Sequence, residues 1–329
     1  MGKLLEVQHL SVEFQTILGT AKAVRDLSFT VDEGEVVGIV GESGSGKSVT
    51  SLTIMGLLDE KSARISSGEI LFEGKNLLKL PEKELCKIRG AEITMVFQEP
   101  AMALNPVIKI EKQLKEIYKI HNPEKVKTCH EELVRLLEKL KIPDAEEVLQ
   151  KYPFQLSGGM KQRIMIAMAV LGKPKLLIAD EPTTALDVTM QAEILELMKL
   201  MKKETGCAVI LITHDLGVVA EMADKVIVMY RGQLVEERKS KDFYQAARHP
   251  YSQDLLEARP EKFTGRFWSI PGSIPNAYTA MESCGYCGRC RKETEECHGQ
   301  IPELISFEDG SRVRCIKCCV QKEKSGEEV

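Results

Sequence analysis

Eight consecutive residues near the start of the chain combine glycine, lysine and hydroxyl side chains in a spacing suited to holding phosphate. They read Gly41-Glu-Ser-Gly-Ser-Gly46-Lys47-Ser48 and fit the pattern G-x-x-x-x-G-K-[ST]. Glycines let the backbone curl so that successive N–H groups face one anion, and the N-terminus of a following helix adds positive potential. Lys47 would reach the β- and γ-phosphates, and the Ser48 hydroxyl would ligate Mg²⁺. A glycine turn that only joins a strand to a helix is the alternative.

Two adjacent carboxylates, Asp180 and Glu181, follow the apolar run of residues 176–179. At the carboxyl end of a parallel strand, a carboxylate lies at the rim of a nucleotide crevice, where Mg²⁺ can be held. Asp180 would hold the metal, often through water, and Glu181 would orient and polarise the attacking water. An apolar strand that ends in Asp-Glu is common, so the pair is informative only because a phosphate loop lies upstream.

A second segment suited to phosphate consists of Ser157, Gly158 and Gly159, which directly precede a helix expected over about residues 161–170. The N–H groups at a helix N-terminus can face an anion. The alternative is a plain N-cap serine with glycines in the preceding turn. Since the chain already has one phosphate loop, a second phosphate-binding end needs another explanation.

The ten cysteines are unevenly distributed, and seven of them crowd residues 284–319. In a reducing compartment such a cluster is more readily a metal site than a disulfide framework. Four thiolates in a compact, turn-rich segment suit either a cubane iron–sulfur cluster or tetrahedral zinc. The segment has too few apolar residues to build a core unaided, so a metal that staples it is favoured over redox sensing or electron transfer.

The elements that position these groups are expected to be strands alternating with helices, which implies a largely parallel α/β sheet. Period-2 alternation predicts half-buried strands, and continuously apolar runs predict strands covered on both faces. Alternating strands are expected at residues 5–7, 12–14 and 27–31, and buried strands at residues 36–40, 176–179 and 209–212. Helices are expected from about Lys47 and over residues 190–204.

Residues 106–150 have helical periodicity, and this stretch is expected to be an insertion between the segments that form the sheet. Composition shifts after about Pro250, where proline, glycine, aromatic residues and then cysteines accumulate. We therefore expect one α/β domain over residues 1–250, with a helical subdomain over about residues 100–165. A small, irregular C-terminal metal-binding domain is expected over residues 251–329.

The bulk properties restrict the function classes. A chain of 329 residues with a net charge of −4 and pI near 6.0 gives no reason to expect nucleic-acid binding. No segment approaches the roughly 18 uncharged apolar residues of a membrane-spanning helix. The first residues do not read as a secretory signal, because a strand-like run follows at once. The expected location is the cytosol, with any membrane association made through partner proteins.

Ser-Gly-Gly ahead of the Asp-Glu pair resembles the signature of the ABC ATPase family, in which each nucleotide lies between the phosphate loop of one subunit and the signature of another. Other positions of the family are also present, in the right order along the chain. Gln98 matches the Q-loop, residues 184–187 match the D-loop, and His214 matches the switch histidine that contacts the γ-phosphate. Phe14 lines up with the aromatic residue that stacks on adenine, although a single Phe in a strand is more often part of a core.

The resemblance implies an ABC-type P-loop NTPase core that binds Mg-ATP, with Glu181, His214 and Gln98 as catalytic residues. Met160 stands where the family most often has Gln, which weakens a polar contact to the partner's nucleotide. The implied Mg²⁺ ligands are Ser48, Gln98 and Asp180. The implied nucleotide-binding residues are Phe14, Gly41, Ser43, Gly44, Ser45, Gly46, Lys47, Ser48, Val49 and Asp187, together with Ser157, Gly158 and Gly159 acting on the partner's ATP.

Within the family, Leu-Ser-Gly-Gly-Met at residues 156–160 is typical of ATPases from oligopeptide and dipeptide importers, which residues 100–106, 248–251 and 270–276 also resemble. The spacing of Cys284, Cys290, Cys297 and Cys315, with Arg289 before the second cysteine, coincides with the C-terminal extension of those importers. The resemblance implies that these four hold a 4Fe-4S cluster. A two-knuckle zinc site is the rival, and the residues that keep the ligand set open are Cys287, Cys318, Cys319 and His298.

The same resemblance implies partners. It implies two membrane-spanning permease subunits, a second homologous ATPase subunit, and an extracytoplasmic peptide-binding protein that acts indirectly. We expect the ATPase pair to be a heterodimer, with a homodimer as the alternative, at the cytoplasmic face of the cell membrane.

Three other functions remain as alternatives. A nickel or other metal-chelate importer has a closely similar ATPase. A soluble ABC ATPase of DNA repair or translation usually carries two cassettes, long coiled coils or DNA-binding zinc modules. A metal-centred redox protein with an incidental phosphate loop is opposed by the complete set of ABC motifs.

Overall fold

The computed structural model describes residues 2–17, 19–184, 187–259 and 268–318. The chain divides into two compact units, which are described separately. The middle unit comprises Met1–Gly2, Asp32–Gly34 and Lys79–Ile210, and the flanking unit comprises Lys3–Val31, Glu35–Leu78 and Leu211–Val329.

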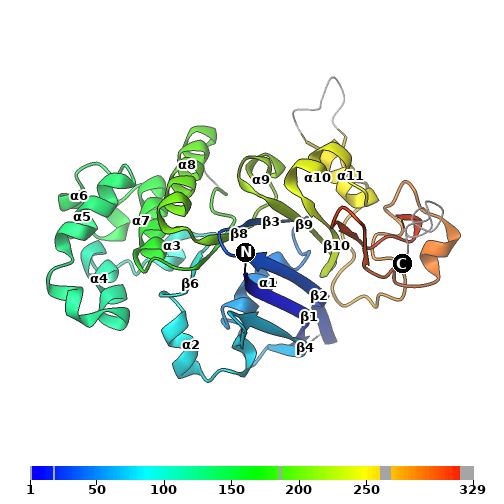
Figure 1. Ribbon diagram of the computed structural model, residues 1–329, viewed down its shortest axis with the longest axis horizontal. Coiled ribbons are helices and arrows are strands. Elements are labelled where there is room, and N and C mark those ends of the chain that lie inside the picture. The colour runs from blue at the N-terminus through cyan, green and yellow to red at the C-terminus, as the bar shows by residue number, and fades with distance from the viewer. Residues whose placement is uncertain (1, 18, 185–186, 260–267, 319–329) are drawn as a thin grey trace. The chain divides into compact units, whose positions relative to one another are not determined.

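Most strands belong to the flanking unit (Figure 1). Its strands are β1 (Lys3–Thr16), β2 (Gly19–Asp32), β3 (Val36–Val40), β4 (Ala63–Phe72), β5 (Lys75–Asn76), β9 (Lys225–Tyr230), β10 (Gln233–Lys239), β11 (Ile305–Ser306) and β12 (Arg312–Val313). Its helices are α1 (Lys47–Ile54), η1 (Leu77–Lys79), α9 (Leu216–Met222), α10 (Ser240–Ala246), α11 (Pro250–Glu257) and η5 (Glu295–His298).

The middle unit is mainly helical. Its helices are α2 (Glu82–Ile88), α3 (Pro100–Ala103), α4 (Ile110–His121), η2 (Pro123–Lys127), α5 (His130–Lys139), α6 (Ala145–Gln150), η3 (Pro153–Gln155), α7 (Gly158–Leu171) and α8 (Val188–Thr205). Its strands are β6 (Ile93–Val96), β7 (Leu176–Asp180) and the start of β8 (Ala208–Ile212). The helical character expected for residues 106–150 is therefore confirmed, and it takes the form of α4, α5 and α6.

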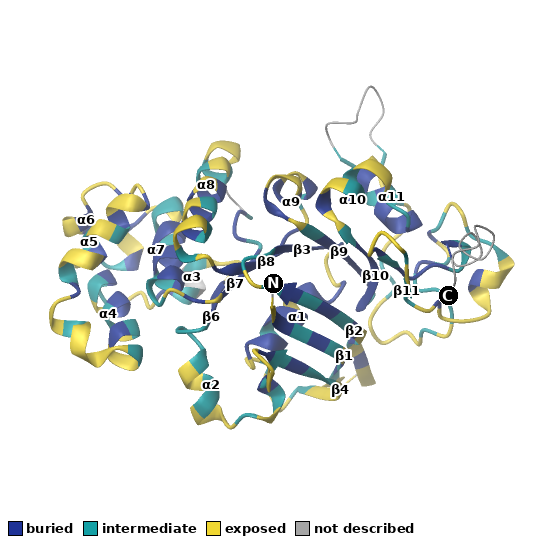
Figure 2. Cartoon of the chain, viewed as in Figure 1, coloured by how far each residue is buried: buried dark blue, intermediate teal, exposed yellow. Residues whose placement is uncertain are grey.

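The first sheet of the flanking unit has the strand order β2-β1-β4-β5, with β4 antiparallel to both β1 and β5. The separate strands expected at residues 5–7 and 12–14 are one strand, β1. Its register against β4 shifts on both sides of Ser11, close to His9 with its φ of 49°. This bulge changes the inward-facing positions from odd to even, because Leu5 and Val7 are buried before it and Leu10 and Val12 after it. The alternation is visible as dark bands on β1 in Figure 2.

The second sheet of the flanking unit is mixed, whereas the alternation of strands and helices predicted a largely parallel one. Strand β9 runs parallel to β3 but antiparallel to β10, and β10 is antiparallel to β12. The reversal between β9 and β10 occurs at Arg231 and Gly232, which both have positive φ (48° and 80°). Two positive φ angles in a two-residue loop make the type I′ turn that suits a hairpin.

In the middle unit, β6 and β7 are parallel and fully buried, as continuously apolar strands predict. Strand β8 lies beside β7. The expected strands at residues 176–179 and 209–212 are thus confirmed to within one residue.

The C-terminal extension contributes strands to the second sheet. Val313 of β12 lies opposite Glu236 of β10, and the backbone N–H of Arg314 donates to the carbonyl of Val235. The expected separation of residues 251–329 as a small metal-binding domain stays a prediction. No helix within the described ranges is long and apolar enough to cross a membrane.

Candidate functional site

The phosphate loop lies between β3 and α1, and three of its glycines have left-handed backbone angles. The φ angles are 152° at Gly41, 80° at Gly44 and 101° at Gly46. A Cβ added at Gly41 would lie 2.2 Å from the Met229 carbonyl oxygen, so close packing also requires glycine there. The glycines therefore allow this loop conformation, and packing against Met229 restricts it.

The side chains of the loop suit an anion. Lys47 is 6% exposed, and its Nζ donates to the carbonyl oxygens of Gly41 (2.8 Å) and Glu42 (3.1 Å). Helix α1 has Gly46 as its N-cap and no side chain that caps its N–H groups. No side-chain carboxylate lies in its first turn, so the N–H groups at the N-terminus of α1 can donate to phosphate oxygens. Among the other predicted residues, Ser43, Gly44 and Ser48 are exposed, Val49 is half-buried and Ser45 is buried.

His214 belongs to the same unit. The Thr213 backbone N–H donates to the Ile39 carbonyl at 3.3 Å, which holds the segment after β8 against the end of β3. His214 itself is exposed at this end, from which the phosphate loop also starts. Phe14, predicted to stack on adenine, is half-buried near the end of β1, opposite Ala63.

The middle unit brings together residues that are distant in sequence. Asp180 is 5% exposed at the end of β7, and the next residue, Glu181, has a φ of 48°. The Glu181 Oε2 accepts hydrogen bonds from Gln98 Nε2 (3.2 Å) and Thr184 Oγ1 (2.8 Å). Two predicted catalytic residues, Gln98 and Glu181, are thus in contact. Thr184 was predicted only as the first residue of the D-loop, and its hydrogen bond to Glu181 was not expected.

The predicted signature lies at the start of α7 in the same unit. Ser157 is the N-cap, and its Oγ accepts from the Met160 backbone N–H at 3.3 Å. A Cβ at Gly158 would meet nothing within 4 Å, whereas one at Gly159 would lie 2.1 Å from Met190 Cε. Gly158 is therefore open to a ligand, and Gly159 allows close packing against α8.

Asp187, expected in the D-loop, is the N-cap of α8. Its carboxylate accepts from the Met190 backbone N–H at 2.9 Å. Ala185 and Leu186 of the same predicted loop lie outside the described residues.

The four predicted cluster ligands line one cavity of about 20 Å³. The cavity wall also includes Cys287. The cysteines among the described residues are free thiols, and Cys319 falls outside that range. The ligands brought together are Cys284, Cys290, Cys297 and Cys315.

The thiols of this cavity have shifted pKa values. Burial raises the pKa of Cys284, raises that of Cys290 to about 11 and raises that of Cys287 to about 12. In contrast, a hydrogen bond with the Cys318 thiol lowers the pKa of Cys315 to about 6. Thiolates at the buried positions need a positive partner, so this donor set fits a thiophilic metal or an iron–sulfur cluster.

A second group of candidate ligands overlaps the first. Cys287, Glu293 and His298 have ligand atoms within 4.8 Å of one another. The His298 Nε2 lies 2.7 Å from Glu293 Oε1. The structure therefore leaves Cys287 and His298 as alternatives in the ligand set.

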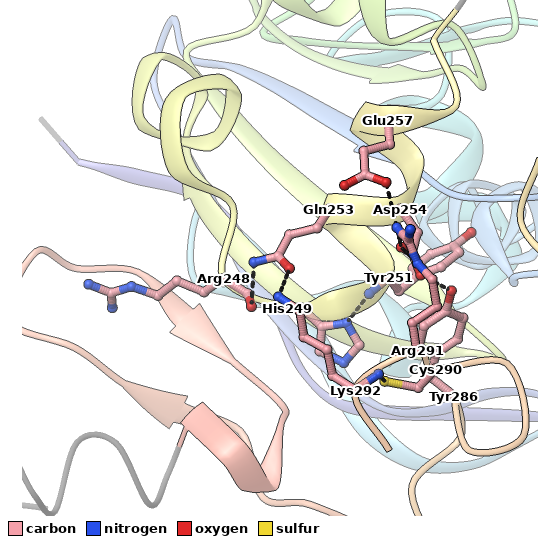
Figure 3. A network of polar contacts seen from close by, with 10 residues as sticks. All are labelled: Arg248, His249, Tyr251, Gln253, Asp254, Glu257, Tyr286, Cys290, Arg291 and Lys292. Atoms are coloured by element: carbon pink, nitrogen blue, oxygen red, sulfur yellow. Dashed lines mark hydrogen bonds and ion pairs between the residues drawn. The ribbon is translucent and has the colours of Figure 1, made fainter. Parts of the chain in front are cut away.

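His249 and Pro250 line the cavity, and Figure 3 shows the polar contacts made by the segment Arg248–Tyr251. Backbone N–H groups of Arg248 and His249 donate to the Glu236 carboxylate at 2.8 and 2.9 Å. The His249 Nδ1 accepts from the Tyr251 backbone N–H at 3.0 Å and so caps α11. Burial lowers the pKa of His249 to about 3, which keeps the ring neutral in this role.

Comparison with known families gives two matches. Residues 24–184 match the ABC transporter family, and residues 235–297 match the C-terminal region of oligopeptide/dipeptide transporters. The dipeptide transport ATP-binding protein DppD of Bacillus subtilis is 46% identical over 317 residues, covering 96% of this chain and 95% of that protein. The oligopeptide transport ATP-binding protein OppD of Haemophilus influenzae is 46% identical over 319 residues, covering 96% and 97%.

Solved structures are similar over the larger part of the chain. A dimeric ATP-binding cassette, MJ0796, in a post-hydrolysis state with ADP and Pi, is 28% identical with a TM-score of 0.61. That match covers 72% of this chain and 98% of the cassette. The protein cbiO1 from Clostridium perfringens, part of the ABC transporter complex cbiONQ, is 29% identical with a TM-score of 0.62, covering 74% and 92%.

Proposed function

Since this chain belongs to the ATP-binding subunits of ABC transporters, in the oligopeptide and dipeptide transport group, we propose that it hydrolyses Mg-ATP to power peptide uptake. The observation that carries this proposal is the contact of Gln98 and Thr184 with the Glu181 carboxylate in a chain with a complete phosphate loop. A carboxylate oriented by two donors at the end of a strand suits the positioning of a water molecule. The names of the relatives do not favour a metal-chelate importer or a soluble ABC ATPase.

In the proposed mechanism the nucleotide lies between two subunits. The loop from Gly41 to Ser48 of one chain holds the phosphates, and Ser157 to Gly159 of the other contact the γ-phosphate. Phe14 stacks on the adenine. The dimeric state of the related cassette MJ0796 supports this shared arrangement. A second, homologous ATPase subunit is the proposed partner.

Glu181 and His214 position water for in-line attack on the γ-phosphate. Ser48, Gln98 and Asp180 would hold Mg²⁺, which would supply neutralisation of charge on the phosphate oxygens. Loss of phosphate removes the charge that held the two subunits together. Two permease subunits, docked near Gln98 and the helical subdomain at about residues 100–165, would convert the opening of the ATPase dimer into transport. The chain would lie at the cytoplasmic face of the membrane. An extracytoplasmic peptide-binding protein would act through the permeases.

The test of this function is Glu181→Gln. We expect turnover to fall by at least about a hundredfold, because the oriented carboxylate is lost, and an ATP-bound dimer to accumulate. ATP hydrolysis and size-exclusion chromatography with Mg-ATP measure both effects. Glu196→Gln, on the exposed face of α8, is the matched control and should behave as the parent chain. Unchanged turnover in Glu181→Gln would remove this residue from its role.

We further propose that Cys284, Cys290, Cys297 and Cys315 hold a 4Fe-4S cluster that staples the C-terminal extension. Their convergence on one cavity supports this proposal. Protein purified without oxygen should contain about four iron and four sulfide per chain and absorb in the visible range. One zinc per chain without sulfide would decide for the tetrahedral alternative.

A further inference from the structure

Arg289, next to Cys290, has an acceptor for each of its five guanidinium N–H groups. Its Nε donates to the Pro271 carbonyl (2.8 Å), and its Nη1 donates to Glu42 Oε1 and to the Tyr230 hydroxyl (both 3.1 Å). Its Nη2 donates to Glu42 Oε2 (3.1 Å) and to the Gly272 carbonyl (3.5 Å). Arg289 is 8% exposed. A buried, fully satisfied guanidinium with a two-oxygen grip on a carboxylate fixes the position of that carboxylate.

The carboxylate belongs to the phosphate loop, since Glu42 is the second residue of that motif and lies 247 positions before Arg289. The Glu42 backbone is held as well. Its N–H donates to the Tyr251 hydroxyl at 2.9 Å, and its carbonyl accepts from Lys47 Nζ at 3.1 Å. Both the side chain and the backbone N–H of Glu42 are therefore held by residues that follow β9 in the chain.

The residues that contact Glu42 belong to, or bond with, a buried aromatic cluster of Tyr230, Tyr251 and Tyr286. Each ring is at most 1% exposed, and the ring centroids are 4.6 to 5.1 Å apart. The Tyr286 hydroxyl donates to Asp254 of α11 at 2.5 Å. Buried aromatic rings at these separations attract one another, so the hydroxyls and Arg289 have little freedom to move.

We propose that Arg289 is a positioning residue for nucleotide binding, which holds the phosphate loop ready for ATP by gripping Glu42. Two physical effects act in the same direction. A glycine-rich loop is intrinsically flexible, so fixing one of its residues lowers the entropy lost on binding. The guanidinium also neutralises a carboxylate within the loop that receives the phosphates. This inference rests on the proposed function, because it assumes that ATP binds at residues 41–48.

The position of Arg289 also links the cysteine segment to ATP. Cys290 is a proposed cluster ligand, and the adjacent residue carries the grip on Glu42. The cysteine segment is therefore connected to the phosphate loop through Arg289.

The test measures equilibrium binding of Mg-ATP and steady-state hydrolysis by the full chain. Arg289→Met should raise the dissociation constant and the KM about tenfold with kcat nearly unchanged, because the loop is positioned before the chemical step. The weakening should shrink at high salt. In the pair Glu42→Gln/Arg289→Met the uncompensated carboxylate is gone but the grip is still lost, so affinity should recover only in part and stay about threefold below that of the parent, as in Glu42→Gln alone.

Arg312→Met is the matched control. Arg312 is a partly buried arginine of the C-terminal extension and pairs with Glu237 of β10 rather than with the loop. It should leave ATP affinity unchanged. An equal loss of affinity in Arg312→Met, or parent affinity in Glu42→Gln and in the double variant, would overturn the proposal, because the grip on Glu42 would then not matter for binding. Parent affinity in Arg289→Met would overturn it as well.

Two further variants keep these outcomes separable. Lys47→Ala tests the loop itself. If Lys47→Ala binds Mg-ATP as tightly as the parent, the proposed ATP site is rejected. If Lys47→Ala loses affinity while Arg289→Met keeps it, only the positioning role is rejected. If Arg289→Met does not fold, Arg289→Lys decides the question. Lysine keeps the charge but not the two-oxygen fork, so about threefold weaker binding is expected and parent affinity would overturn the proposal.

Discussion

The phosphate loop and the cysteine segment are built in opposite ways. The loop is eight adjacent residues whose shape follows from glycine backbone angles and from the strand and helix on either side. The cysteine segment gathers thiols spread from Cys284 to Cys315 around a cavity and depends on β10 and α11 for its contacts. A substitution in the loop can therefore abolish ligand binding while the fold stays stable. A substitution in the cysteine segment should reduce metal binding and stability together.

The largest effect is expected in the cysteine segment. Cys290→Ser should lose most of the bound metal and lower the unfolding temperature, since four thiolates share roughly 10–16 kcal/mol of binding free energy in structural zinc sites and each contributes several kcal/mol. Metal analysis and thermal unfolding measure the two effects. Cys287→Ser, on the same cavity, is the matched control and should keep its metal. Equal metal loss in both variants would show that the ligand set is wrong.

Lys47→Ala tests the opposite half of the comparison. Mg-ATP should bind about a hundredfold more weakly, a loss of roughly 3 kcal/mol, because a charge-assisted contact to the phosphates is gone. The unfolding temperature without nucleotide should stay unchanged, since Lys47 Nζ donates to the carbonyls of Gly41 and Glu42 in its own loop. Lys75→Ala, on the exposed face of β5, serves as the control in both measurements. A large fall in the unfolding temperature of Lys47→Ala would show that the two regions do not differ in this way.

The smallest effect is expected at His130, which belongs to neither region and gives a baseline. Its ring nitrogens each lie 2.8 Å from a carboxylate, Glu146 and Glu111, and these hydrogen bonds raise the pKa of His130. The raised pKa stabilises the fold below about pH 6.5, and this contribution disappears as the pH rises through the folded-state value. His130→Gln should therefore cost under about 1 kcal/mol at pH 5.5 and less at pH 8, because the ring is partly exposed. Urea unfolding at the two pH values measures this difference, and a greater loss at pH 8 would contradict the assignment.

Local sequence was enough for the parts of the fold that depend on neighbours in the chain. The apolar run at residues 36–40 is β3 with the expected bounds, and Ser157 does begin a helix. The glycine spacing also indicated the phosphate loop without any knowledge of the rest of the molecule. In each case the informative residues lie within a few positions of one another in the sequence.

Features that depend on distant pairing could not be predicted in this way. The bulge in β1 is defined only against β4, and the Arg231–Gly232 turn reverses a sheet that alternation alone describes as parallel. Arg289 was noticed only for its place before a cysteine. Its grip on Glu42 spans 247 positions, and a lone Glu and a lone Arg carry no signal that joins them.

Glu181 occupies a backbone conformation, with φ of 48°, that glycine or asparagine adopts more readily than glutamate does. For folding alone, glutamate is thus a poor choice at this position. A descendant of this chain that no longer needed to split ATP would gain stability by drifting to glycine or asparagine there. At this position, the residue that would make the fold most stable is not the residue that ATP hydrolysis requires.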